Sequence, residues 1–228
     1  MFPTMQSVGT PTYKRDQVER AIAKVTGRLA DNEPSAEDLL KVDLKRLIDF
    51  DRAEVPPNKP GRYAFFDQPM GQGRDTAYTV HDAFALLVGE RLLYGGLPQS
   101  RVVRFVRFLR NELDPELDRI LGIPLDILRP SVSPDERSTR IRYGTLVEDI
   151  NQMSFLVAPA APSLESSLRL LPLSEFSSHF FCCSQELPRA TAHFGKAKLT
   201  VIALELANIA LQLEHWLARI PVRKRGRS

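Results

Sequence analysis

The chain has 228 residues, a length that suits one large domain or two small ones. Hydrophobic residues make up 43% of the sequence, which is enough for a folded core and argues against general disorder. The formal net charge of +3 excludes a polycation of the histone type, so any nucleic-acid surface must be local.

The sequence carries no export or membrane signal. Its two cysteines, Cys182 and Cys183, are neighbours and cannot form a disulfide framework, which is typical of a reducing compartment. The N-terminus lacks a charged region followed by an apolar run, so no signal peptide is expected. The most apolar stretch contains Glu205 and Glu214, which argue against a membrane span. We therefore predict a cytoplasmic protein with no membrane partner.

Two helices are predicted near the N-terminus. The first spans residues 13–29 and places its apolar side chains on one face. The second begins at Ser35, where Asp38 approximates a capping box, and its charged residues are interpreted as a solvated face. The proline-rich residues 55–61 form a linker, after which residues 62–67 and 75–79 are predicted to pair as a β-hairpin.

Residues 79–113 predict two helices joined by a tight turn. Thr79 is a suitable N-cap because its hydroxyl can accept from a free amide in the first turn. Gly95 and Gly96 end the first helix, since glycine adopts the left-handed conformation at low cost. Pro98 begins the second helix at a position where its missing N–H has no partner to lose.

The second of these helices has an apolar face and an arginine-bearing face. Four arginines recur at every third position, and no Asp or Glu lies between Pro98 and Arg110. Guanidinium groups on a helix match DNA phosphates and the guanine edges of the major groove. The sequence therefore predicts DNA contacts by Gln99, Ser100, Arg101, Arg104, Arg107 and Arg110.

The turn resembles that of helix-turn-helix transcriptional regulators. A glycine and an apolar residue precede a Pro/Gln/Ser start to the next helix, and the matching residues are Gly96, Leu97, Gln99 and Val102. Leu92 departs from the pattern, because a small residue is usual four positions before the turn glycine. The preceding hairpin and the long helix that follows are similar, loosely, to those of MerR-like regulators. The resemblance covers about residues 79–113 and implies double-stranded DNA as a partner.

The arginine row has other interpretations. It can be the solvated basic face of an ordinary core helix, because a charge run on a helix is usually a wet surface. It can also be a surface for RNA or for an acidic protein. The sequence leaves these alternatives open.

Further along the chain the elements become shorter. A short helix is predicted from Asp114 to Leu121, and the polar residues 130–138 form a boundary between two halves. A strand is expected at residues 152–157, and a helix is introduced at residues 171–174.

The last predicted element is a long helix over residues 196–219. Its apolar residues step alternately by three and four, as in a coiled-coil seam. The seam consists of Leu199, Ile202, Leu206, Ile209, Leu213 and Trp216. It predicts either a homodimer interface or a core helix within one chain, and both alternatives stay open. The basic tail after residue 221 either solubilises the protein or adds contacts to DNA.

No catalytic signature or metal-ligand spacing is present, so we predict a protein that is not an enzyme and has no cofactor.

The expected fold class is α+β, mostly α-helical. Residues 1–129 hold the helix-turn-helix, 139–221 serve association or sensing, and 222–228 are the tail. The expected function is a DNA-binding regulator that uses residues 98–113 for recognition, dimerises through the C-terminal helix and has an unknown effector. The alternative is a protein–protein adaptor or assembly component with no nucleic-acid role.

Overall fold

The computed structural model describes residues 11–28, 34–55, 62–66, 77–122, 154–159, 181–183, 185–196 and 201–222. The elements in this part of the chain are β1 (Tyr13–Lys14), α1 (Arg15–Val25), α2 (Pro34–Glu54), β2 (Ala77–Tyr78), α3 (Val80–Tyr94), α4 (Gln99–Leu121), β3 (Ser154–Pro159), β4 (Phe181–Cys183), α9 (Leu187–Lys196), β5 (Val201–Glu205) and α10 (Leu206–Arg219). Helices predominate, and the strands form two small antiparallel sheets, which confirms the predicted α+β, mostly α-helical class.

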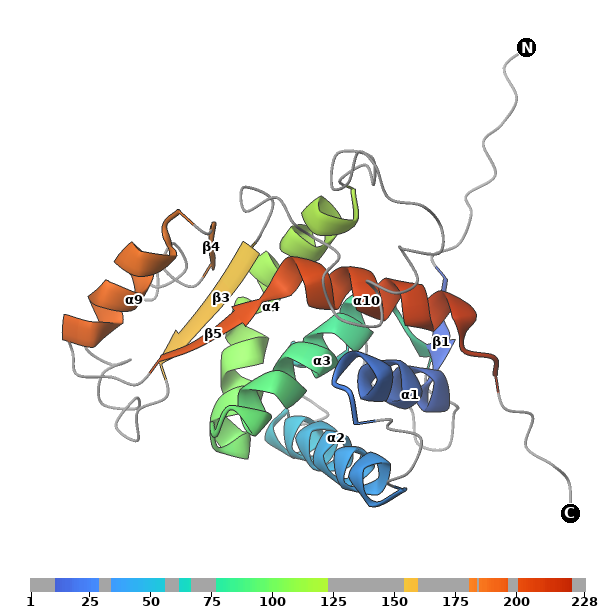
Figure 1. Ribbon diagram of the computed structural model, residues 1–228. Helices are drawn as coiled ribbons and strands as arrows, with labels where there is room; N and C mark the ends of the chain where they lie inside the picture. Colours follow the sequence, from blue (N-terminus) through green and yellow to red (C-terminus); the bar gives the residue numbers. More distant parts are fainter. Residues whose placement is uncertain are drawn as a thin grey trace, which may run out of the picture.

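The helices pack around α3 and α4 at the centre of the molecule. In Figure 1, α10 lies above α3 and α2 lies below it, and both helices contact α3. The larger sheet extends away from this helical part beside α9, which packs against β3. None of the described helices is long and apolar enough to cross a membrane.

The two sheets join segments that are far apart in the sequence. In the smaller one, Tyr13 of β1 opposes Tyr78 of β2. In the larger one, β3 is central, with β4 on one side and β5 on the other. Phe155 of β3 opposes Glu205, the last residue of β5, and α10 begins at the next residue. Pairing with β3 therefore fixes where α10 starts.

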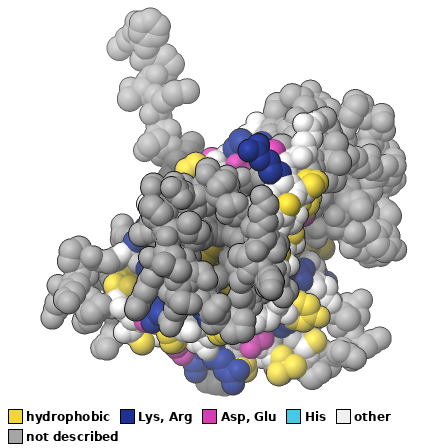
Figure 2. Space-filling model, turned by 90° about the vertical axis from the view of Figure 1, so that its left-hand side faces the viewer, with side chains coloured by type: hydrophobic (Ala, Val, Ile, Leu, Met, Phe, Trp, Pro, Cys, Tyr) yellow, Lys and Arg dark blue, Asp and Glu magenta, His cyan; other side chains and the backbone are white. Residues whose placement is uncertain are grey.

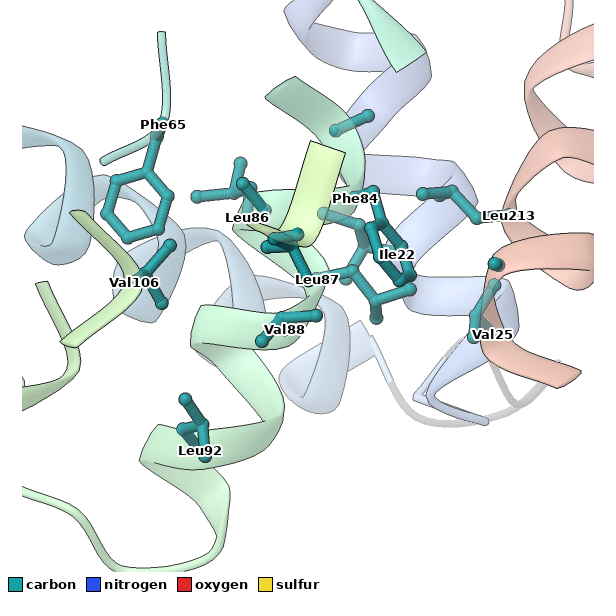
Figure 3. Packing of buried hydrophobic residues seen from close by; sticks show 14 of the residues in the cluster. Ile22, Val25, Phe65, Phe84, Leu86, Leu87, Val88, Leu92, Val106 and Leu213 are labelled. Atoms are coloured by element: carbon teal, nitrogen blue, oxygen red, sulfur yellow. The ribbon is translucent and has the colours of Figure 1, made fainter. Parts of the chain in front are cut away.

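The core is formed mainly by side chains of α1, α3, α4 and α10. Leu86 and Leu87 of α3 are almost completely buried, and Figure 3 shows Ile22 and Val25 of α1 on the side of the core that Leu213 of α10 closes. α3 is apolar nearly all round, as expected for a helix surrounded by others. The burial of so much apolar surface makes the hydrophobic effect the main stabilising term.

The predicted helix, turn and second helix are confirmed between Thr79 and Leu113. The Thr79 hydroxyl accepts from the Asp82 amide at 3.1 Å, and an Asp82 carboxylate oxygen accepts from the Thr79 amide at 2.9 Å. This reciprocal pair is a capping box that starts α3. Gly96 has a φ of +97°, the left-handed conformation that the turn needs, and Pro98 is the N-cap of α4.

Three predicted elements differ from the structure. The predicted hairpin is wrong, because β2 pairs with β1 and residues 62–66 form no strand. The short helix expected from Asp114 is instead the last part of α4, which continues through Pro115 to Leu121. Pro115 cannot donate to the carbonyl of Asn111, but this single lost bond lies at an exposed position and the apolar face continues on both sides.

The long terminal helix is the third difference. Residues 196–219 do not form one helix, because α9 ends at Lys196, β5 occupies residues 201–205 and α10 begins at Leu206. Val201 and Ile202 are β-branched residues, which favour a strand. The heptad spacing of the sequence therefore runs across a strand and a helix.

The predicted dimer seam is correspondingly divided. Leu206 and Leu213 are fully buried in the core of their own chain, so their assignment to a dimer interface is wrong. Ile202 lies in β5, and Ile209 and Trp216 are partly buried against the same core. Leu199 lies outside the described residues, as do the predicted boundary at residues 130–138, the helix after residue 171 and the end of the basic tail. The strand expected at residues 152–157 is confirmed as β3.

Candidate nucleic-acid interface

Arg110, predicted to contact DNA, is a core residue. Its side chain is fully buried, and its guanidinium donates to Asp114 Oδ1 at 2.7 Å, to Asp82 Oδ1 at 2.9 Å and to the carbonyl of Ala64 at 3.0 Å. Burial opposes the charged form, but the charges of Asp114 and Asp82 outweigh this effect and raise the pKa of Arg110. The prediction for Arg110 is therefore wrong.

Arg107 also turns towards the protein. Its guanidinium donates to Asp51 Oδ1 at 2.7 Å and to Glu54 Oε2 at 3.0 Å, both on α2. The second carboxylate oxygen of Asp51 accepts from the backbone amides of Ala64 and Phe65 at 2.8 and 3.2 Å. Arg107 is thus part of an ionic network that joins α2, residues 62–66 and α4, and its predicted role as a groove contact is wrong.

The N-terminal end of α4 stays at the surface. Gln99, Ser100 and Arg101 are half-buried, and Arg104 is 58% exposed. The Nε and Nη2 of Arg104 both lie 2.8 Å from Glu54 Oε1, while the side chain stays exposed to solvent. The first turn of α4 contains no acidic residue. The positive end of the helix dipole therefore adds to the charge of the arginines.

α2 supplies additional cations beside this end of α4. The Gln99 side-chain amide donates to the carbonyl of Arg46 at 2.6 Å, so the two helices touch there. The Arg46 side chain is 66% exposed and approaches Asp43 only to 4.0 Å, and Lys45 is exposed as well. Surface pairs at such a separation are weak. We define the α2–α4 basic surface as Lys45, Arg46, Gln99, Ser100, Arg101 and Arg104.

Sequence reasoning missed the contribution of α2. Lys45 and Arg46 lie in a stretch with Asp43, Asp49 and Asp51, which read as a balanced, solvated face. In the structure Asp51 is fully buried and is used by Arg107, so one negative charge is removed from that face. Only the tertiary contact between α2 and α4 reveals this change in charge balance.

The exposed charges are interspersed rather than of one sign. Figure 2 looks at the side of the molecule that lies on the left in Figure 1, where the turn between α3 and α4 projects. Lys and Arg side chains gather along its lower edge, next to acidic and apolar ones. The described part of this face can hold phosphate oxygens at a few positions, but its charges are mixed in sign rather than uniformly positive.

The two histidines whose side chains the structure describes, His81 and His215, pair with neighbouring side chains rather than with metal-ligand sets. His81 lies 2.8 Å from Asp118, and His215 contacts Arg219. In the part of the chain that the structure describes, no three His, Cys, Asp or Glu residues lie together as metal ligands would.

Comparisons with family models, curated proteins and solved structures give no match. The function must therefore follow from the surfaces of the chain itself.

Proposed function

We propose that the protein is a regulator that binds double-stranded DNA through the α2–α4 basic surface. The observation that carries this proposal is the pair of exposed guanidinium groups, Arg46 and Arg104, which lie on two helices that touch at Gln99. In this proposal Arg46 and Lys45 bind phosphates. Gln99, Ser100 and Arg101, at the start of α4, meet the duplex next to them.

The internal ion pairs of Arg107 and Arg110 are compatible with this proposal. In helix-turn-helix proteins the first residues of the recognition helix contact base edges, and the rest of the helix packs against the domain. Here the partly buried Arg107 and the buried Arg110 hold α4 against α2 and α3 through Asp51 and Asp82. They support the angle at which the N-terminal end of α4 projects.

The alternative function, a protein–protein adaptor built around the terminal helix, has less support from the structure. It required a free apolar seam, and Leu206 and Leu213 are buried inside the chain. For the same reason these residues take no part in the DNA-binding proposal, which does not depend on a dimer.

The proposal is tested by fluorescence anisotropy of labelled random-sequence duplexes with the full-length chain. Binding should weaken as salt rises from about 50 to 200 mM, and the double logarithmic slope should change by about 0.9 for each phosphate contact. Arg46→Gln and Arg104→Gln should each reduce the slope and the affinity.

Arg119→Gln is the matched control, because Arg119 is an exposed arginine at the other end of α4, paired with Glu116. It should leave binding unchanged. Absence of salt-dependent binding, or equal effects of Arg119→Gln and Arg104→Gln, would contradict the proposal.

A further inference from the structure

A cleft of about 800 Å³ opens where the C-terminal ends of α1 and α3 meet the junction of β5 and α10. This volume lies in the range of small-molecule sites. Apolar side chains from all of these elements form much of its wall: Val25, Tyr94, Ile202, Leu204 and Ile209. The cleft is formed by different residues from those of the α2–α4 basic surface.

Gln212 of α10 lines this cleft and lacks a partner. Its side chain is only 7% exposed, and none of the described residues forms a hydrogen bond with its amide. Buried side-chain amides in folded proteins are nearly always hydrogen-bonded. The donors and acceptor of Gln212 are therefore available to a ligand group in the cleft.

The other polar residues of the cleft are largely engaged. Glu205 accepts from the backbone amides of Ala207 and Asn208 at 2.8 and 2.9 Å, so its carboxylate caps α10. Arg91 donates to the carbonyl of Val25 at 3.2 Å and lies 3.9 Å from Glu90. Glu205 and Arg91 therefore already have partners within the protein and are not expected to bind a ligand.

Lys24 of α1 is the remaining cation of the cleft. Its ammonium lies 5.6 Å from the centre of the Trp216 ring and forms no ion pair with any described residue. Trp216 follows Gln212 by four positions on α10, so the two side chains are one helical turn apart on the same face. Lys24 and Gln212 both line the cleft, and Trp216 links them: it contacts the Lys24 ammonium and follows Gln212 by one helical turn.

We propose that the cleft binds a small apolar carboxylic acid. Its carboxylate accepts from the Lys24 ammonium and the Gln212 amide, and its hydrocarbon part packs against Ile202, Leu204 and Ile209. Lys24 has a ring contact but no carboxylate partner among the described residues, and this one cation without an ion pair matches one negative charge, which disfavours a phosphate dianion. The apolar walls disfavour a polar sugar or nucleotide.

The only tryptophan of the chain, Trp216, has its ring centre 5.6 Å from the Lys24 ammonium and reports binding through that contact. The full-length protein is titrated with phenylacetate and octanoate, and with the neutral analogues phenylacetamide and octanamide. We expect a saturable change in tryptophan fluorescence and at least tenfold tighter binding of the acids. Isothermal titration calorimetry gives the same constants independently of the chromophore.

Two variants separate the contributions of the polar residues. Gln212→Leu replaces the amide with an apolar side chain of similar size. The variant should bind the acids at least tenfold more weakly. Lys24→Met should remove the preference for the acids over the amides. Arg119→Gln, at the far end of α4, should leave both unchanged. Circular dichroism verifies that each variant is folded, and calorimetry of Lys24→Met avoids any direct effect on Trp216.

The proposal is overturned if no probe binds saturably, if the amides bind as tightly as the acids, or if Gln212→Leu binds like the parent protein. These measurements contain no DNA. Their outcome is therefore independent of the proposed regulator function.

Discussion

The guanidinium of Arg110 donates to the carboxylate of Asp82 across 2.9 Å in the interior of the protein. Asp82 also accepts from the backbone amide of Thr79, so the same carboxylate caps α3 and positions α4. The residue that the sequence offers as a DNA contact is thus a link between the two helices of the helix-turn-helix.

Replacement of Arg110 by methionine should destabilise the protein strongly. The change leaves Asp82, which is 3% exposed, without its cationic partner, and loss of one member of a buried pair costs about 3–5 kcal/mol. Urea denaturation followed by circular dichroism measures the loss. Arg119→Met is the control: its pair with Glu116 is exposed, so we expect a change below about 1 kcal/mol. Equal costs for the two variants would show that the Arg110 network adds nothing to stability.

The arginine row shows where sequence reasoning stops. The spacing in the sequence correctly places Arg101, Arg104, Arg107 and Arg110 on α4. The acidic partners of Arg104, Arg107 and Arg110 are Asp51, Glu54, Asp82 and Asp114, and only Asp114 lies on the same helix. The acids from α2 and α3 are far from the arginines in sequence, so the absence of Asp and Glu within the arginine stretch does not reveal them.

Local signals were read correctly where the cause of the structure is local. The N-cap Thr79 and the left-handed Gly96 depend on residues close in sequence, and the sequence predicts both; the reciprocal bond from the Thr79 amide to Asp82 was not predicted. The pairing of β1 with β2 and the strand β5 depend on distant segments. The periodicity of residues 199–220 fits a helix, but pairing with β3 overrides it for Val201 and Ile202.

Glu90 should make the protein less stable as pH rises. Burial raises the pKa of Glu90 above 4.5, and it outweighs the opposing effect of Arg28, whose Nη2 lies 3.1 Å away. The folded state therefore holds the proton more tightly than the unfolded state does. The stabilising effect of protonated Glu90 is complete below pH 4.5. It is lost as the pH rises through the pKa that Glu90 has in the folded state.

Glu90→Gln tests this pH dependence. Glutamine is neutral at every pH, and Arg28 keeps its second partner, Asp43, at 3.5 Å. The free energy of unfolding of the variant should exceed that of the parent by an amount that grows from pH 4.5 towards neutral pH. Urea denaturation at a series of pH values measures the difference. A constant difference between the two proteins would show that Glu90 does not titrate in this interval.

Gly89 should resist replacement by alanine although it lies within a helix. A Cβ atom there would stand 2.9 Å from Cε1 of the buried Phe65, so the ring must move. Alanine favours a helix over glycine by about 1 kcal/mol, but overpacking of a core costs about 1–3 kcal/mol. We expect net destabilisation in thermal unfolding.

The same Gly89→Ala change in a Phe65→Leu background should be neutral or stabilising. If it still destabilises the protein, the clash with the Phe65 ring is not the cause of the loss.

Gly96 should resist replacement for a different reason. No atom lies within 4 Å of a Cβ placed at Gly96, so steric contact with neighbours plays no part. Its φ of +97° is unfavourable for residues with a side chain, and a single residue in the left-handed region costs roughly 1–2 kcal/mol. Gly96→Ala should therefore lower the free energy of unfolding by about that amount. Gly96→Asn should cost less, because asparagine tolerates left-handed backbone better. If alanine and asparagine have the same cost in urea denaturation, the backbone conformation of the turn is not its cause.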